Sequence, residues 1–232
     1  ELLDEGVLHH QADLAHSIDY LVRTGVDGFY HGDLGDALVR ESRASGGYLT
    51  RKDLAAYRVL VRDPLLVAGR KGRFVLNPPP ASGGVLVGFG LKLARDMALG
   101  SFGSARHLEA VSGVLHATGL ARGEYGASPV ILSDELCESY RMMIGERPLS
   151  QRGTTHISVV DQDGNLAAAT LSNGSSSGRV VPKTGIMMNN MLGEADLSSD
   201  GFHQWPCGVR MTSMMTPALY LGADGSSVAL GS

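Results

Sequence analysis

The pair Gly153-Thr154 is the point in this sequence where one residue could supply both a nucleophile and the base that activates it. A threonine hydroxyl is a poor nucleophile by itself, but a threonine that begins a new chain also carries a free α-amine. The reference pKa of such an amine is about 8, which suits a base at neutral pH. The bond before Thr154 would first have to be cut, and Gly153 favours that step because glycine tolerates strained backbone. The alternative is that Thr154 and Thr155 are ordinary strand-forming residues.

Other motifs with catalytic or binding chemistry are scarce. The sequence contains no His-Glu-x-x-His zinc motif and no Gly-x-x-x-x-Gly-Lys phosphate loop. The run SNGSSSG at residues 172–178 lacks the lysine and the following helix of a phosphate loop, which favours a plain surface loop. Cys137 and Cys207 are two lone cysteines, so they indicate neither a disulfide framework nor a zinc site.

The element that must position Thr154 is a hairpin. From Thr155 onward, the residues alternate with the period of two that is typical of a half-buried strand. The pair Asp163-Gly164 is a hairpin signal, because both central positions of the favoured turn have positive φ. A second strand is predicted over Leu166–Ser172. Two strands joined by a tight turn are therefore expected directly after Thr154.

The rest of the chain changes from helices to strands at Gly153. Before Gly153, apolar spacing and stop signals predict helices at residues 12–25, 33–45, 84–99, 104–121 and 133–144, a capped helix start at Thr50, and two short strands around residues 69–72. After Gly153, strands are predicted at residues 155–161, 166–172, 185–189 and 217–221, with Asp224-Gly225 marking another hairpin. A helical half followed by a strand half predicts an α+β fold.

Size and charge narrow the class of protein. The 232 residues suffice for one large domain or two small ones. A net charge of -4, with no local cluster of lysine and arginine, argues against nucleic acid as a partner. The longest apolar run, GGVLVGFGLKLA, is broken by glycines and a lysine and is too short to span a bilayer.

Four segments together resemble the γ-glutamyltranspeptidase family of N-terminal-nucleophile hydrolases. They are GGYLTRKDLAAYRV, NPPPASGG, GTTHISVVDQDGN and TGIMMNNML, and they keep this order along nearly the whole chain. The resemblance implies a four-layer αββα sandwich and a precursor that cleaves itself between Gly153 and Thr154. Residues 1–153 would then be the C-terminal part of the large-subunit region, mainly helical. Residues 154–232 would be the N-terminal part of the small-subunit region, mainly strands.

The same resemblance assigns the catalytic residues. Thr154 matches the nucleophile, and Thr155 matches the second threonine of the motif. The family has a Thr-x-Asn segment that orients the nucleophile, and Ser172 with Asn173 stands in its place. Thr154 would form an acyl-enzyme from a γ-glutamyl amide such as glutathione, which water or an acceptor amine would resolve. The resemblance implies no cofactor and no metal. It would place the protein in the periplasm or outside the cell, although the sequence itself indicates no compartment.

The departures from the family pattern concern the pocket for the glutamyl head. Glu194 stands where an aspartate binds the α-ammonium of the substrate, and Met191 replaces a glutamine. Ser213-Met214 replaces a pair of serines that holds the α-carboxylate, so one of two donors is missing. A hydrogen bond to a charged group is worth roughly 1.5–3 kcal/mol, so losing two would lower discrimination by a factor of about 10 to 10⁴. Met191 and Met214 could instead be core fillers.

Three functions follow as hypotheses. The first is an autoprocessing γ-glutamyl hydrolase or transferase, whose partners would be a γ-glutamyl donor, an amine or water acceptor, and the large and small subunits of one precursor. The alternatives are an acylase or amidase of different acyl specificity, and a catalytically silent scaffold. The family's oxyanion loop follows a Gly-Ser pair like Gly231-Ser232, and its carboxylate-clamping arginine would precede Glu1. The 232 residues thus resemble a central slice of a longer protein and are expected to be inactive alone.

Overall fold

The computed structural model describes residues 6–142, 144, 154–195, 197, 198, 201 and 203–231. The chain divides into two compact units. The helical unit comprises Glu1–Val61 and Asn173–Met191, and the sheet unit comprises Arg62–Ser172 and Leu192–Ser232. Each unit therefore combines residues from both sides of the predicted cleavage bond. Gly153, on one side of that bond, lies outside the described residues.

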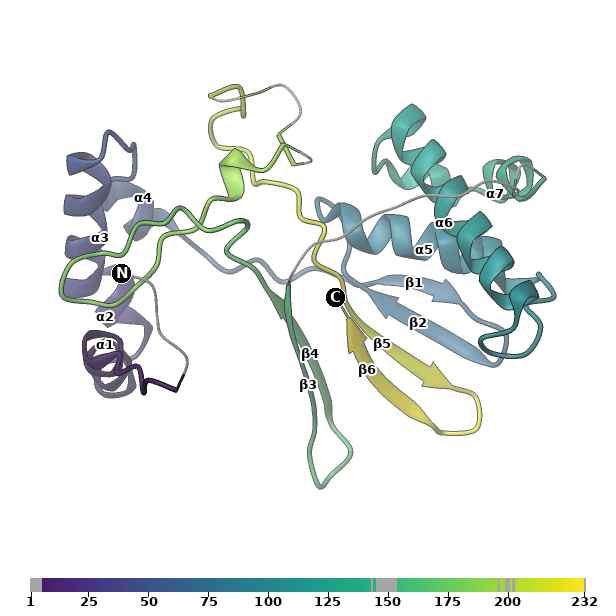
Figure 1. The fold of residues 1–232 in the computed structure, drawn as a ribbon, viewed down its shortest axis with the longest axis horizontal. Helices are drawn as coiled ribbons and strands as arrows, with labels where there is room; N and C mark the ends of the chain where they lie inside the picture. Colours follow the sequence, from purple (N-terminus) through teal and green to yellow (C-terminus); the bar gives the residue numbers. More distant parts are fainter. Residues whose placement is uncertain are drawn as a thin grey trace. The chain divides into compact units, whose positions relative to one another are not determined.

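The helical unit is built on short helices whose ends follow local sequence signals (Figure 1). These helices are α1 (Ala12–Thr24), α2 (Val26–Tyr30), α3 (Asp33–Ala44) and α4 (Arg51–Ala56). α1 ends at Gly25, whose φ of 66° is the left-handed conformation that glycine tolerates. α4 begins with the predicted capping box, in which the Asp53 carboxylate accepts the Thr50 backbone N–H at 2.8 Å. The helices at residues 12–25 and 33–45 are confirmed, whereas α2 was not predicted.

A loop over residues 173–191 returns to this unit and is tied to two of its helices. The Ser17 hydroxyl in α1 donates to the Thr184 carbonyl at 2.7 Å, and both residues are buried. Glu41 in α3 pairs with the Arg179 guanidinium at 2.6 Å. These contacts join residues that lie far apart in the sequence.

The predicted strand Gly185–Asn189 is wrong, because the described loop forms only isolated bridges, one between Asn173 and Ser175 and one between Val180 and Met187. Lys183 and Gly185 have φ values of 62° and 66°, which turn the chain too sharply for a longer ladder. A Cβ on Gly185 would also lie 2.7 Å from the Leu14 side chain, so the backbone packs directly on α1.

The sheet unit contains two antiparallel sheets and a helical layer (Figure 1). Its elements are β1 (Leu65–Ala68), β2 (Gly72–Leu76), α5 (Ser82–Arg95), α6 (Ala105–Tyr125), the 3₁₀ helix η1 (Pro129–Leu132), α7 (Asp134–Arg141), β3 (Thr155–Val160), β4 (Leu166–Leu171), β5 (Pro217–Gly222) and β6 (Ser227–Gly231). A further 3₁₀ turn, η2 (Met191–Gly193), lies where the two units meet in the sequence. One sheet has the order β1-β2-β5-β6, and the other is the β3–β4 hairpin.

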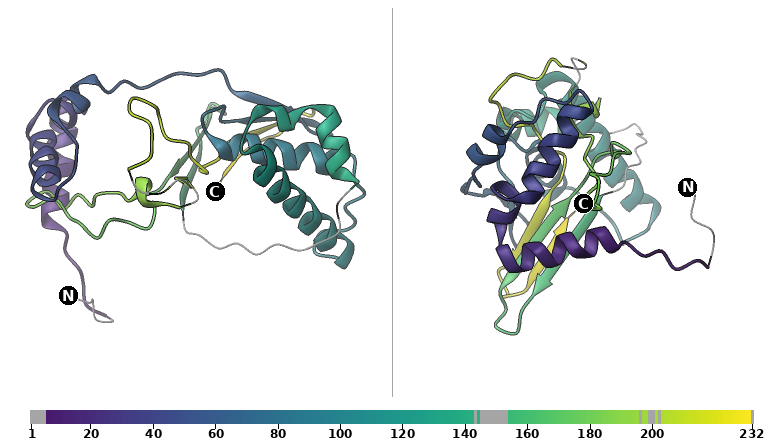
Figure 2. Two further views of the ribbon diagram at one scale, coloured as in Figure 1. Left: turned by 90° about the horizontal axis from the view of Figure 1, so that it is seen from above. Right: turned by 90° about the vertical axis from the view of Figure 1, so that its left-hand side faces the viewer.

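The two faces of the four-stranded sheet meet different partners. Val67, Leu76 and Ala218 point to one face and pack with Leu91 of α5 in an apolar core. Gly231 points to the opposite face, where a Cβ would lie 2.5 Å from the His156 ring of β3. The β3–β4 hairpin accordingly lies beside β5 and β6 (Figure 2). The layer order is helices, four-stranded sheet, hairpin.

This order confirms the α+β fold and corresponds to three layers of an αββα sandwich. The outer face of the hairpin carries Ile157 and Val159, which are 50% and 51% exposed, so the described residues supply no fourth layer over it. The sequence predicts a hairpin turn at Asp224-Gly225 but gives no bounds for the strand after it, which is β6. The turn is confirmed, since Gly225 has a φ of 84° and β5 pairs with β6.

The helical layer contains the larger core and yields a stability prediction. Phe89 in α5 is fully buried and makes an edge-to-face contact with Tyr140 of α7, with ring centroids 5.7 Å apart. We expect Phe89→Ala to lower the free energy of unfolding by about 3–5 kcal/mol, because it removes a buried ring and leaves a cavity. Phe102 is 95% exposed and serves as the control, for which Phe102→Ala should cost less than about 0.5 kcal/mol. Equal urea midpoints for the two variants would contradict the assignment of Phe89 to the core.

Candidate active site

Two of the predicted catalytic residues, Thr154 and Ser172, lie directly beyond the paired ends of β3 and β4. In the β3–β4 ladder Thr155 pairs with Leu171, and His156 pairs with Thr170. The same register extended by one residue sets Thr154 opposite Ser172. Side chains alternate along a strand, so this pair lies on the same face as His156, whereas Thr155 lies on the other face. Thr154 is exposed and Ser172 half-buried. Thr154 and Ser172 thus form the open end of the hairpin.

The closed end of the hairpin fixes this register. The Asp161 carboxylate accepts hydrogen bonds from the backbone N–H of Asp163 and from both the backbone and the side-chain amide of Asn165. Hydrogen bonds from Asn165 lower the pKa of the Asp161 carboxyl. Gly164 has a φ of 80°, but Asp163 does not have positive φ. The hairpin is therefore confirmed, but the two-residue turn is wrong, since the loop is a longer one that ends on a left-handed glycine.

Contacts with β6 hold the hairpin against the four-stranded sheet. The Ser158 hydroxyl donates to the Ala229 carbonyl at 3.0 Å. A Cβ at Gly231 would lie 2.6 Å from His156 Nδ1 and 2.7 Å from the Thr216 carbonyl oxygen. Glycine is required at this position because the imidazole already fills the space. The polar face of the hairpin, which carries Thr154 and Ser172, is thus the face turned toward the sheet.

Asn173, the next predicted residue, belongs to the helical unit. It is exposed, and its carbonyl accepts the backbone N–H of Asn190 at 2.9 Å. This hydrogen bond joins the segment after Ser172 to the segment TGIMMNNML, which lies more than ten residues later in the sequence. Within that segment the side chain of Asn189 accepts the backbone N–H of Met191 at 3.1 Å.

Glu194 is buried, with 9% of its surface exposed, and it follows η2. Its carbonyl accepts backbone N–H groups from Leu197 at 3.0 Å and Ser198 at 2.9 Å, so the backbone turns back on itself after Glu194. A buried carboxylate is costly unless a cation or hydrogen-bond donors compensate it. Met191, three residues earlier, is half-buried.

Ser213 and Met214 lie against the N-terminus of α5. The Ser213 carbonyl accepts from the Ser82 hydroxyl at 3.0 Å and from the Gly83 N–H at 3.1 Å. The Ser213 hydroxyl accepts the Met215 N–H at 3.1 Å. Met214 is 37% exposed and its sulfur lies 3.1 Å from the Ser82 hydroxyl oxygen, so its interpretation as a core filler is wrong.

The segment NPPPASGG supplies positioning residues that the sequence analysis did not identify. The Asn77 side chain donates to the Met215 carbonyl at 2.9 Å. A Cβ on Gly83 would lie 2.1 Å from the Thr216 hydroxyl, and a Cβ on Gly84 would lie 1.9 Å from the Asn77 carbonyl. The pair Gly83-Gly84 at a helix start was the available signal, since it permits close approach of another chain segment. The segment containing Ser213 therefore rests on α5 through its backbone.

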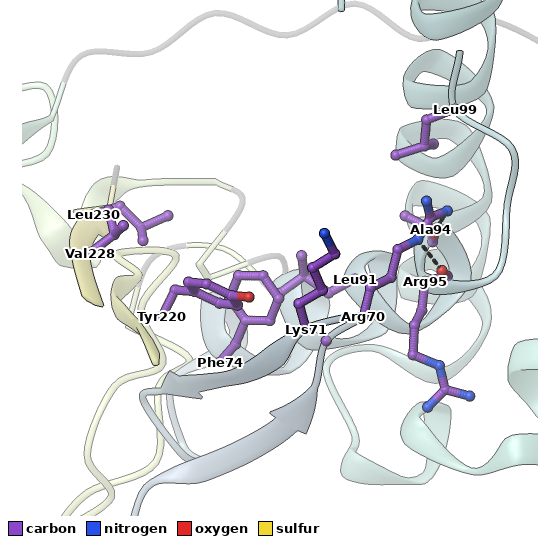
Figure 3. Close-up of a pocket in the computed structure, with 11 residues that line it drawn as sticks. Arg70, Lys71, Phe74, Leu91, Ala94, Arg95, Leu99, Tyr220, Val228 and Leu230 are labelled. Atoms are coloured by element: carbon purple, nitrogen blue, oxygen red, sulfur yellow. Dashed lines mark hydrogen bonds between the residues drawn. The ribbon is translucent and has the colours of Figure 1, made fainter. Parts of the chain in front are cut away.

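A separate apolar cavity lies on the helix side of the four-stranded sheet (Figure 3). It has a volume of about 510 Å³, and Phe74, Tyr220, Leu230 and Leu91 contribute to its walls. These strand residues point toward α5, the opposite direction from Gly231 and the hairpin (Figure 3). The cavity is therefore not part of the arrangement around Thr154.

The part of the chain that the structure describes offers neither a metal site nor a membrane-spanning helix. There, no group of three or more histidine, cysteine, aspartate or glutamate residues is arranged to hold a metal ion. Across the same residues, no helix combines the length and apolar character needed to cross a membrane. The polar hairpin face with Thr154 and Ser172 remains the arrangement best suited to chemistry.

Comparison with known proteins shows which family the chain resembles. A family model described as Gamma-glutamyltranspeptidase matches residues 1–232. The glutathione hydrolase proenzyme of Escherichia coli K12 is 29% identical over 83% of this chain and 38% of its own length. The acylase ACY 1 proenzyme of Pseudomonas sp. SE83 is 28% identical over 99% of this chain and 45% of its own length. A crystal structure of cephalosporin acylase from Bacillus halodurans superposes with a TM-score of 0.70 at 26% identity, covering 91% of this chain and 42% of that one.

Proposed function

The chain belongs to the gamma-glutamyltranspeptidase family, and on that basis we propose that its protein is an autoprocessing γ-glutamyl hydrolase or transferase. The chain spans less than half the length of the curated relatives it matches, from 38% to 45% in the two compared above. The proposal accordingly concerns the whole protein. The observation that carries it is the hairpin register, which begins with the pair Thr155–Leu171 and, continued by one residue, would set Thr154 opposite Ser172.

In the proposed reaction Thr154 acts twice. In the precursor, its hydroxyl oxygen attacks the carbonyl carbon of Gly153, the C–N bond breaks, and the departing nitrogen takes the hydroxyl proton and becomes the α-amine of Thr154. Water then hydrolyses the resulting ester, which restores the Thr154 hydroxyl and leaves a carboxylate on Gly153. In the mature protein that amine accepts the proton of the hydroxyl, whose oxygen attacks the γ-carbonyl carbon of the donor. The leaving amine takes the proton, and the glutamyl group stays as an ester on Thr154. Water or an acceptor amine then releases it.

The other residues of the hairpin end take supporting roles in this proposal. Ser172 would hydrogen-bond the Thr154 hydroxyl and orient it, since the register continued by one residue would make the two residues cross-strand neighbours. Thr155 continues the motif on the opposite face of β3 and takes no direct part in bond making. Asn173 links the hairpin to Asn190 through its backbone. The bond to Gly153 is the proposed cleavage site, and the 153/154 division separates the large-subunit and small-subunit regions.

We assign recognition of the donor's α-ammonium to Glu194 and of its α-carboxylate to Ser213. Glu194→Gln keeps the volume of the side chain but removes its charge, so KM for a γ-glutamyl anilide should rise about 10- to 100-fold. A glutaryl anilide lacks the ammonium, and its KM should change by less than about twofold. Glu194→Asp restores the family's residue and should keep the preference for the γ-glutamyl donor. Equal changes in KM for both anilides would remove Glu194 from this role.

Acyl transfer of a different specificity is the second candidate. It is favoured by the two acylase relatives and by Met214, which stands beside Ser213 with 37% of its surface exposed. Steady-state assays of the full-length protein with γ-glutamyl, glutaryl and simple acyl anilides separate the two candidates. Preference for γ-glutamyl anilide supports the main proposal, and preference for glutaryl or simple acyl anilide supports the second. A processed protein that turns over none of them, and whose Thr154 is not labelled by a glutamine-analogue electrophile, would be the silent scaffold.

A further inference from the structure

A chain of hydrogen bonds runs through the imidazole of His156, on the same hairpin face as Thr154. His156 Nδ1 lies 2.7 Å from the Thr170 hydroxyl on β4. His156 Nε2 lies 3.0 Å from the Ser158 hydroxyl on β3. The Ser158 hydroxyl in turn donates to the Ala229 carbonyl of β6 at 3.0 Å. One half-buried ring therefore connects three strands from two sheets.

The chain of bonds has a single direction when the imidazole is neutral. A carbonyl oxygen only accepts, so the one proton of Ser158 is used on Ala229. The Ser158 oxygen must then accept from His156, which places the ring proton on Nε2. Nδ1 is left as an acceptor, and the Thr170 hydroxyl donates to it. Every member of the chain is satisfied in this one arrangement.

The position of this chain along the hairpin gives it a consequence for Thr154. His156 is two residues after Thr154 on β3, and Thr170 is two residues before Ser172 on β4. The pair His156 and Thr170 therefore lies on the same face of the hairpin as Thr154 and Ser172, two residues away along each strand. On the other side, Gly231 admits the ring because it has no side chain. The imidazole is therefore a side-chain anchor two residues from Thr154.

We propose that His156 is a positioning residue: with Thr170 and Ser158 it fixes the strand that carries Thr154 against β4 and β6. The inference rests on the proposed function, because His156 affects catalysis only if Thr154 is the nucleophile. His156 acts on the orientation of the nucleophile and not on donor binding, so its loss should lower kcat and leave KM unchanged. A displacement of about 1 Å in a reacting group can cost about 10²-fold in rate.

Substitution of the hydroxyl partner tests the proposal with little risk to folding. Thr170→Val keeps the shape of the side chain and removes the donor to Nδ1, and we expect kcat of the full-length protein to fall about 10- to 100-fold with KM within about twofold. Thr170→Ser restores the hydroxyl and should return kcat to within about threefold of wild type. Thr118→Val in α6 is the matched control, since it removes a hydroxyl that bonds only its own helix at 2.8 Å, and kcat should not change. An unchanged kcat in Thr170→Val would overturn the inference.

A spectroscopic measurement separates this inference from the proposed function. In ¹⁵N-histidine NMR spectra of the full-length Thr154→Ala protein, which needs no turnover, His156 should show the neutral tautomer protonated at Nε2. Ser158→Ala should change the His156 signals and leave those of His116 in α6 unchanged. A ring protonated at Nδ1 would overturn the inference whatever the activity. Wild-type protein with the expected tautomer but no turnover of any γ-glutamyl donor would overturn the proposed function and leave the hydrogen-bond chain supported.

Discussion

Replacement of Thr154 by alanine is expected to keep the full-length precursor as a single polypeptide and to lower kcat/KM for a γ-glutamyl anilide by at least about 10⁴-fold. Both effects follow from one group, because the hydroxyl of Thr154 attacks the upstream carbonyl during processing and the donor carbonyl during turnover. Intact mass spectrometry after long incubation at neutral pH reports the first effect. Release of the chromogenic aniline reports the second.

Thr155→Ala is the matched control for this experiment. Thr155 is the same residue type one position later, but its side chain lies on the opposite face of β3. We expect Thr155→Ala to be processed and to retain activity within about tenfold of wild type, since it removes no group from the reactive face. Cleavage that persists in Thr154→Ala would indicate an external protease. Loss of processing in Thr155→Ala alone would mean that the wrong threonine has been assigned.

Removal of the Ser172 hydroxyl is expected to produce the second largest loss. Ser172→Ala should lower kcat for the γ-glutamyl anilide by about 10²- to 10³-fold, because an oriented hydrogen bond to a reacting group contributes on this scale. KM should stay within about threefold, since Ser172 faces the nucleophile and not the donor. Ser172→Thr keeps the hydroxyl and should recover most of the activity. Steady-state kinetics of the two processed variants check these values.

Ser139→Ala controls for the loss of a serine hydroxyl elsewhere in the sheet unit. Ser139 in α7 donates to the Leu136 carbonyl of its own helix at 2.9 Å. This variant should match wild type in kcat and KM. A Ser172→Ala protein with normal kcat would contradict the cross-strand role of Ser172. If KM alone rose, Ser172 would belong to the donor pocket.

Local signals predicted the elements of this fold well. The Thr50–Asp53 capping box, the stop at Gly25 and the alternation from Thr155 onward depend on neighbours within a few residues. The pairing of Thr155 with Leu171 follows from the same short-range information, because the hairpin is closed by a loop of a few residues. The sequence could thus indicate this half of the candidate site.

Contacts between distant segments could not be read from these signals. Residues 185–189 were predicted as a strand, yet the loop that contains them packs against Leu14 and Ser17 of α1. The support of Ser213 by Ser82 and Asn77 likewise joins segments far apart in the sequence. No local pattern encodes which segments will meet, so tertiary packing overrides local preference at these places. The division of residues 154–232 between two units was missed for the same reason.

The pairing of β2 with β5 has a thermodynamic consequence for a processed molecule. β2 precedes the bond between Gly153 and Thr154 and β5 follows it, yet they share one ladder that runs from Gly72–Gly222 to Leu76–Ala218. After cleavage, this ladder would join two separate polypeptides, so unfolding would release two molecules in place of one. The melting temperature should then rise with protein concentration, which cannot happen in the uncut precursor. After unfolding and dilution, the two polypeptides of the cleaved protein would have to bind each other before they could refold. The uncut precursor would refold as a single chain.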